Sequence, residues 1–288
     1  LRLVGRDGSE HHLVGGAMAI VLRRSVFDEI LVAEALRDGA RLERGVRVDR
    51  LLRHRGVVVG VGAGDREIEG DVVVLASGAH CRLSWDPRPR QRLDGVVARY
   101  AGVQATEGTV EMAFHRRIAP HYAWLFPEPE GTVNVGVVCA RDRRGASIRE
   151  LFEELTAESF PSLRGAEQVG RLRGHPILYS NSARFLVAEG VLRVGEAARL
   201  TDGFTGEGIW HAMRSGLEAA EAIEAGDLHR YGWRCRLVFD PLLRGADLMA
   251  RFATTRGFDW ATRAAAAPPV QRLVARLLAG HASLGAAR

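Results

Sequence analysis

The sequence predicts an α/β fold with α+β elements, in which a β/α part is interrupted by a mostly antiparallel sheet and then resumed. Three observations lead to this prediction. A continuous apolar run at 72–76 ends in small residues, as a buried strand does when it delivers a loop to a site. Apolar and polar residues alternate through 96–140. Helical patterns fill most of the chain after residue 206, which predicts a C-terminal helical region.

The elements are predicted in order along the chain. After an extended segment at 11–22, Phe27, Ile30, Leu31, Ala35 and Leu36 fall on one face of a helix that Gly39 ends. A linker is expected at 86–92 and a helix at 147–160. The strands are expected at 46–52, 57–62, 72–76, 96–104, 109–114, 121–126, 132–138, 168–173 and 191–195, and the C-terminal helices at 206–225, 228–253 and 268–279.

Composition excludes several classes of protein. The 288 residues are 47% hydrophobic and 26% charged, which is ordinary for a globular protein, and no apolar run approaches the ~20 residues of a membrane span. The cysteines Cys81, Cys139 and Cys235 lie far apart without a C-x-x-C pair, so the sequence argues against a disulfide framework or a zinc site. This cysteine usage favours a protein of the reducing cytoplasm. The net charge of +5 comes from arginines that are scattered along the sequence, which argues against a nucleic-acid partner.

The stretch VGEAARLTDGFTGEGIWHAMRSG at 194–216 carries the strongest functional signal. Gly203, Gly206 and Gly208 crowd before a predicted helix, although a glycine inside a helix costs roughly 1 kcal/mol relative to alanine. With Asp202 or Thr205 capping the helix, the N–H groups of residues 206–209 would be free to bind an anion or an electron-rich ring. A glycine-rich loop that only makes a tight helix entry is the alternative.

This stretch resembles the second flavin-binding motif of FAD-dependent oxidoreductases of the p-hydroxybenzoate hydroxylase fold, and it is most similar to the geranylgeranyl reductase branch. In that family the loop lies along the ribityl chain and the isoalloxazine ring of FAD. The resemblance therefore implies FAD as the cofactor. The cofactor-binding residues that it implies here are Gly195, Glu196, Asp202, Thr205, Gly206, Glu207, Gly208 and Ile209.

Three further stretches resemble the same family. RRSVFDEIL is similar to its R-x-x-F-D helix, which implies that Arg24 contacts the cofactor, and Val48 falls at its adenine-side backbone contact. LASGAHCRL at 75–83 is similar to the third motif. PHYAWLFP is similar to the P-x-x-Y-x-W-x-F-P signature, which implies a substrate site at Tyr122, Trp124, Phe126 and Pro127.

The three aromatic residues around Trp124 occupy every second position of a predicted strand. On a strand, Tyr122, Trp124 and Phe126 lie on one face. Such a face suits a long apolar substrate without hydrogen-bonding groups. It would equally serve as a ladder that packs the core of the sheet, and the sequence leaves both interpretations open.

With the resemblance, the fold becomes a partial FAD-binding Rossmann-like domain interleaved with an antiparallel-sheet substrate domain. The first part of the FAD-binding domain is expected at 17–84, truncated because no G-x-G-x-x-G turn precedes it. The substrate domain is expected at 85–167, the second FAD-binding part at 168–226, and the helical region at 227–288. Glu196 and Ser77 stand where the family has Asp.

The resemblance implies an FAD-dependent oxidoreductase that reduces carbon–carbon double bonds of an isoprenoid, such as a geranylgeranyl group. An external electron donor, NAD(P)H or ferredoxin, is expected; the proton donor stays open between Tyr122 and His121. The alternatives are a monooxygenase or halogenase of the same fold, or a degenerate homologue without catalysis. Without the segment that binds the pyrophosphate, the chain alone is expected to hold FAD weakly and to aggregate.

The pattern at 268–279 indicates an amphipathic helix. Val270, Leu273, Val274, Leu277 and Leu278 form an apolar arc, opposite arginines. This pattern predicts either peripheral membrane contact or a helix docked on a globular domain. The cysteine usage predicts a cytoplasmic location, and this helix adds the expectation of membrane association.

Overall fold

The computed structural model describes residues 1–12, 20–83, 85–87, 91–104, 108–140 and 146–265. Within them the chain divides into two compact units. Unit 1 comprises 1–40, 94–175 and the chain from 251 onward, and unit 2 comprises 41–93 and 176–250. The predicted division into an interrupted and resumed β/α part is consistent with this interleaving. The four predicted domain ranges are not tested by it and stay predictions.

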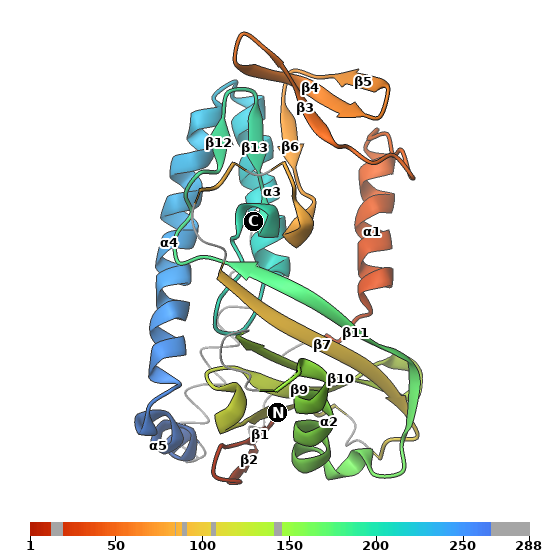
Figure 1. Cartoon of the computed structure of the whole chain (residues 1–288), viewed down its shortest axis with the longest axis vertical. Helices are drawn as coiled ribbons and strands as arrows, with labels where there is room; N and C mark the ends of the chain where they lie inside the picture. Colours follow the sequence, from red (N-terminus) through yellow and green to blue (C-terminus); the bar gives the residue numbers. More distant parts are fainter. Residues whose placement is uncertain (13–19, 84, 88–90, 105–107, 141–145, 266–288) are drawn as a thin grey trace. The chain divides into compact units, whose positions relative to one another are not determined.

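The centre of unit 1 is a seven-stranded sheet (Figure 1). Its strand order is β11-β7-β10-β9-β8-β1-β2. β8, β9 and β10 form an antiparallel meander, whereas β1 pairs parallel with β8, with Leu3 opposite Met112. The strands are β1 (Arg2–Val4), β2 (Glu10–His12), β7 (Gln91–Ala101), β8 (Glu111–Phe114), β9 (Tyr122–Pro127), β10 (Thr132–Ala140) and β11 (Glu167–Tyr179).

One face of this sheet is covered by α2 (Ile148–Ser159). The helix begins with a capping box, in which Ser147 accepts from the N–H of Glu150 and the Glu150 carboxylate accepts from the N–H of Ser147. Leu151, Phe152 and Leu155 then pack against alternate residues of the strands, because residues three and four apart share one helical face. The predicted helix at 147–160 is confirmed.

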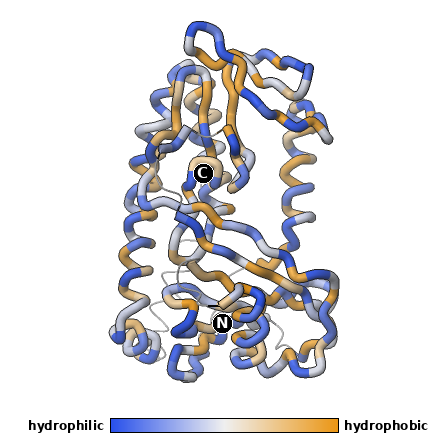
Figure 2. Tube along the Cα trace, viewed as in Figure 1, coloured by the Kyte–Doolittle hydropathy of each residue, from blue (hydrophilic) through white to orange (hydrophobic). Residues whose placement is uncertain are grey.

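Helix α1 (Arg24–Arg37) has no buried residue. The expected apolar face is present in the sequence, and Figure 2 shows apolar and polar residues along the helix. Ile30 is 50% exposed, and Leu31 and Leu36 are similarly exposed. The helix therefore forms as predicted, but no described residue covers its apolar side.

Unit 2 contains two three-stranded sheets. One has the order β12-β13-β6, in which β13 pairs parallel with β6. The other is an antiparallel meander of β3, β4 and β5. The strands are β3 (Arg50–His54), β4 (Val57–Ala63), β5 (Arg66–Glu69), β6 (Val73–Leu75), β12 (Val187–Ala188) and β13 (Val191–Arg193). A strand was expected at 46–52. The observed strand, β3, begins four residues later, at Arg50, because its pairing with β4 begins there.

Two long helices complete the core of unit 2. α3 (Ile209–Glu224) and α4 (Leu228–Phe252) bury Ala219, Ala222, Tyr231, Cys235 and Phe239 together with Leu192 of β13. The short helix α5 (Arg256–Ala265) follows α4 and belongs to unit 1. The helix expected at 268–279 lies outside the described residues. Among the described residues, no helix is long and apolar enough to cross a membrane.

The remaining short segments are one-turn 3₁₀ helices. Those used below are η1 (Gly78–His80), η2 (Arg116–Ile118) and η6 (Gly195–Ala198). The α/β fold class with an antiparallel sheet and C-terminal helices is confirmed.

Candidate functional site

The loop that joins β13 to α3 carries most of the predicted cofactor-binding residues. The chain leaves β13, turns through η6 and continues by way of Thr201 to Gly208. Gly195 has a positive φ of 54°, and a Cβ at this position would lie 2.9 Å from the Cβ of Ala212. Its N–H also donates to the Ser215 hydroxyl at 2.9 Å. Gly195 therefore holds α3 close to the end of β13.

The crowded glycines have reasons within the chain itself. Gly206 adopts a φ of +77°, which favours glycine. A Cβ on Gly203 would lie 2.4 Å from the Tyr179 ring, and one on Gly208 would lie 3.1 Å from Thr201 Oγ1. The alternative of a tight helix entry thus accounts for these glycines without a ligand.

The helix cap differs from the expectation. The Asp202 carboxylate accepts from the N–H groups of Phe204 and Thr205 at 2.5 and 3.0 Å, so it closes the loop instead of capping α3. The N–H of Gly206 donates to the Asp202 carbonyl at 3.0 Å. The N–H of Glu207 donates to the Thr205 hydroxyl at 3.2 Å. The expectation that these two N–H groups are free is therefore wrong.

The start of α3 nevertheless offers unused polar groups. Gly208 is the N-cap and has no side chain to accept from the first turn, whose N–H groups lack partners inside the helix. Among the described residues, the buried Thr201 Oγ1 and both ring nitrogens of His211 have no hydrogen-bond partner. Unsatisfied buried polar side-chain atoms are rare, and three of the eight among the described residues lie here, on Thr201 and His211. This loop is therefore a candidate site for a polar ligand.

His211 was not singled out by sequence reasoning. It is 4% exposed, and its ring lies against Phe239 and Trp210 with centroid distances of 5.5 and 5.3 Å. Burial lowers its pKa, and the negative charges of Glu207 and Asp202 act in the opposite direction. Because histidine ionises near pH 6.5 in water, the imidazole is neutral at pH 7. No sequence pattern marked it, because its lack of hydrogen-bond partners is a property of packing.

Glu196 lies in η6, and its carboxylate is bonded within the protein. Its Oε1 accepts from the N–H of Leu178 at 2.8 Å. The residue that follows η6, Arg199, adopts the left-handed conformation with a φ of 57°. Glycine adopts this conformation at the lowest cost, so the backbone at Arg199 is strained.

The two remaining predicted cofactor residues lie in different units. Arg24 is at the start of α1 in unit 1, where its exposed guanidinium pairs with Asp28 at 3.1 Å. Val48 is half exposed in unit 2 and lines a cavity of about 830 Å³ between β6 and the β3–β5 meander. The wall of this cavity is mostly aliphatic.

The predicted substrate residues lie together on β9. Tyr122, Trp124 and Phe126 form one continuous aromatic face, with centroid distances of 6.0 and 6.3 Å between successive rings. All three are partly exposed, whereas Ala123 and Leu125 point to the opposite side and are buried in the core beneath α2. The aromatic residues therefore do not pack the main core of the sheet, which favours the interpretation as a binding face.

Trp124 is held in a fixed position on this face. Its Nε1 donates to Asn134 Oδ1 at 2.8 Å, and a Cβ on Gly136 would lie 2.1 Å from its ring. Gly136 is opposite Trp124 in the β9–β10 register, so the ring lies flat on the neighbouring strand. Pro127 ends β9 opposite Val133. A fixed, flat indole gives an apolar ligand a rigid surface at low entropic cost.

Comparison with known proteins identifies relatives. A digeranylgeranylglycerophospholipid reductase of Methanothrix thermoacetophila is 32% identical over 247 residues, which cover 78% of this chain and 62% of that protein. The protein of the same name from Methanoculleus marisnigri is 29% identical over 254 residues, covering 78% and 61%. The chain is homologous to the geranylgeranyl reductases. It spans about three fifths of the length of these curated relatives.

Solved structures share the fold of this chain. A geranylgeranyl bacteriochlorophyll reductase-like protein of Thermoplasma acidophilum has a TM-score of 0.69 at 20% identity, covering 96% of this chain and 73% of that one. The flavin-dependent brominase Bmp2 has a TM-score of 0.74 at 22% identity, covering 97% and 75%. The TM-scores show that the chain has the fold of flavin-dependent oxidoreductases. No family model matches the chain.

Proposed function

We propose that the protein is an FAD-dependent oxidoreductase that reduces carbon–carbon double bonds of a geranylgeranyl-type isoprenoid. The relatives are named for the reduction of a digeranylgeranyl glycerophospholipid. The observation that carries the proposal for this chain is the partly exposed aromatic face of β9, directed away from the core beneath α2. An isoprenoid chain has no hydrogen-bonding groups, so apolar contact is its main means of recognition.

The loop at the start of α3 fits a flavin. The uncapped helix N-terminus, Thr201 Oγ1 and His211 are buried or uncommitted polar groups that a flavin ring edge would satisfy. Gly195, Gly206, Gly208 and Ile209 bring backbone close to that position, with Thr205, Glu207 and Asp202 shaping the loop. Bound reduced FAD supplies the hydride for the reduction.

The residues of the chain then have three tasks. The helix start stabilises the negative charge that a reduced flavin carries, because its N–H groups form the positive end of the helix dipole. The neutral His211 contributes a hydrogen-bonding group without a competing positive charge. The aromatic face of β9 orients the alkene and excludes water from it.

Trp124→Ala tests the proposal. Because the chain alone is expected to hold FAD weakly, the assay supplies dithionite-reduced FAD in large excess. With a prenylated lipid or prenyl diphosphate, we expect the protein to yield a saturated product detected by mass spectrometry. The variant should raise KM by about tenfold or more, because the truncation removes a large apolar contact with the isoprenoid worth on the order of 1.5–3 kcal/mol. Trp233→Ala, which truncates a half-exposed indole on α4, is the control and should leave KM unchanged. Absence of saturated product from every isoprenoid offered would contradict the proposal.

The similarity to a brominase keeps one alternative in the same assay. If the protein is a halogenase or monooxygenase, an aromatic compound should be modified in the presence of oxygen and NAD(P)H, without alkene reduction.

The electron donor of the proposed reductase is NAD(P)H or ferredoxin, and stopped-flow bleaching of the flavin by each will distinguish them.

Peripheral contact with a membrane is proposed for the C-terminal segment, and liposome co-sedimentation of a 268–288 deletion tests it.

A further inference from the structure

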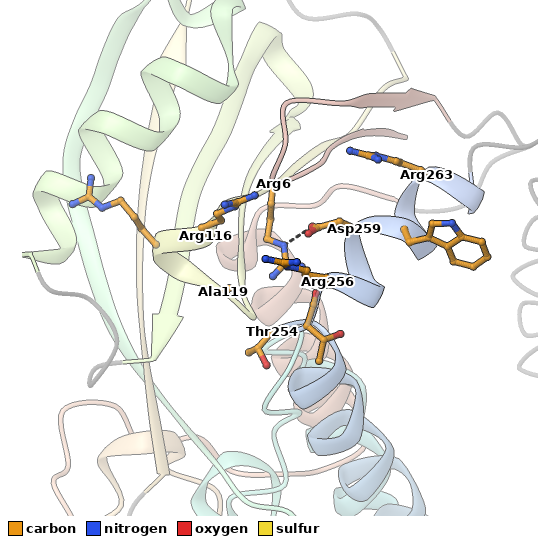
Figure 3. A pocket seen from close by; sticks show the side chains of 10 residues that line it. Arg6, Arg116, Ala119, Thr254, Arg256, Asp259 and Arg263 are labelled. Atoms are coloured by element: carbon orange, nitrogen blue, oxygen red, sulfur yellow. Dashed lines mark hydrogen bonds and ion pairs between the residues drawn. The ribbon is translucent and has the colours of Figure 1, made fainter.

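A cavity of about 860 Å³ in unit 1 is lined by five arginines. They come from separate parts of the chain: the β1–β2 turn, the η2 segment between β8 and β9, and the α4–α5 junction with α5. Figure 3 shows Arg6, Arg116 and Arg256 directed to one region. The charged lining residues are Arg6, Arg116, Arg117, Arg256, Arg263 and Asp259.

Three of these arginines are already paired. Arg6 binds Asp259, with Nε 2.7 Å from Oδ1 (Figure 3). Arg263 pairs with Asp7, and Arg117 pairs with Glu154. Arg116 and Arg256 are exposed, and neither forms an ion pair within the part of the chain that the structure describes. Two guanidinium groups at the cavity are thus available to an anion.

Arg6 gives the cavity a fixed base. Its side chain is 7% exposed, and besides Asp259 it donates to the carbonyls of Ala253 and Thr255 at 2.8 and 2.5 Å. These bonds fasten the β1–β2 turn to the α4–α5 junction. The arginine cavity is therefore built by tertiary contacts and is more than a group of mobile surface side chains.

A line of aromatic rings connects this cavity to the aromatic face of β9. The Arg6 guanidinium lies 5.4 Å from the centre of the Phe258 ring. Phe258 contacts Phe114 at 5.1 Å, and Phe114 contacts Tyr122 at 6.1 Å, where the aromatic face begins. All of these residues belong to unit 1. Phe258 is 8% exposed, so these packed rings fix the arginine cavity beside the aromatic face of β9 and are not themselves an open binding surface.

We propose that the arginine cavity binds the phosphate or diphosphate head group of an amphiphile whose isoprenoid chain lies along the aromatic face of β9. Guanidinium groups match phosphate oxygens with paired, charge-assisted hydrogen bonds. Arg116 and Arg256 make these bonds, and Arg6 positions the cavity. That the amphiphile is the substrate rests on the proposed function; that a phosphorylated isoprenoid binds here does not.

Equilibrium dialysis with geranyl diphosphate and with geraniol tests the inference without flavin or turnover. We expect Arg116→Ala/Arg256→Ala to weaken binding of geranyl diphosphate by at least about tenfold, because each lost charge-assisted bond is worth about that factor or more. Binding of geraniol should not change. Arg149→Ala, an exposed arginine on α2 that does not line the cavity, is the control and should bind as the wild type does.

Arg116→Lys/Arg256→Lys retains the charge without the planar fork, and it should bind with intermediate affinity. Equal loss in the Arg149 variant, or equal affinity of the wild type for diphosphate and alcohol, would overturn the inference. So would binding of the wild type to phosphatidylglycerol vesicles without binding of soluble geranyl diphosphate, since the arginines would then form a membrane-docking surface. Intact diphosphate binding without alkene reduction would contradict the proposed function alone.

Discussion

A single residue, His211, combines the properties that mark the α3 start as a site. It is buried, both ring nitrogens lack partners among the described residues, and burial lowers its pKa. The unfolded chain ionises histidine near pH 6.5, so as the pH falls below that value the unfolded state takes up a proton before the folded state does. The contribution to stability is therefore complete above about pH 6.5 and is lost as the pH falls toward the lowered folded pKa.

Replacing this imidazole tests that account. In His211→Phe, the new ring can remain against Phe239 and Trp210 and does not titrate. The free energy of unfolding in urea should then fall less between neutral and mildly acidic pH than it does in the wild type. His229→Phe, at an exposed position, serves as the control. The same acid dependence in wild type and His211→Phe would show that His211 is not held neutral.

At the scale of elements, α3 and α4 are joined by a buried carboxylate. Glu218 is 1% exposed and pairs with Arg214 of its own helix and Arg234 of α4. Burial raises its pKa, but the two guanidinium groups outweigh burial, so the net pKa is lowered. Its contribution to stability is present above the unfolded value of about 4.3 and is lost as the pH falls through the lower folded pKa.

Glu218→Gln should lower the free energy of unfolding at pH 7 by about 1–3 kcal/mol, because charge-assisted bonds to two arginines are lost. Glu221→Gln on the same helix removes an exposed partner of Arg234, 2.9 Å from its guanidinium, and should change stability by less than about 1 kcal/mol. Urea denaturation measures both. If the two variants lowered the free energy of unfolding equally, the burial of the Glu218 ion pairs would add nothing to stability.

The elements also show what the sequence could predict. Alternation located β8, β9 and β10 because one side of each faces a core and the other does not. It underestimated β11, whose exposed residues include Arg171 and Arg173 and give no apolar period. β1 was missed, since its three residues are ordered by pairing with β8, more than a hundred positions away. The segment expected to be a linker contains Asp86, which is buried between Arg193 and Arg199.

At the scale of the whole molecule, the candidate sites were predictable to the extent that they are contiguous in sequence. The α3 loop and the aromatic strand are local motifs, and the structure orders both. The arginine cavity joins distant segments, and the same arginines look scattered in the sequence. His211 and Thr201 could not be distinguished from ordinary helix-start residues, because their lack of partners is a property of packing.

The described surface also leaves apolar groups uncovered, which has a consequence for the chain as a whole. β6 is an edge strand of its three-stranded sheet, Val74 on it is 40% exposed, and it borders the aliphatic cavity of about 830 Å³. Helix α1 adds exposed Ile30 and Leu36. Exposed edges and apolar patches promote association between chains.

We therefore expect the 288-residue chain to associate increasingly as its concentration rises from micromolar to hundreds of micromolar, measured by light scattering after size exclusion. Val74→Lys places a charge on the β6 edge and should shift the mass toward that of one chain. Val169→Lys is the matched control: it lies on the edge strand β11 and is 47% exposed, but its neighbours Arg171 and Arg173 already protect that edge. A monomeric wild type at every concentration would refute the prediction, as would equal effects of the two lysines.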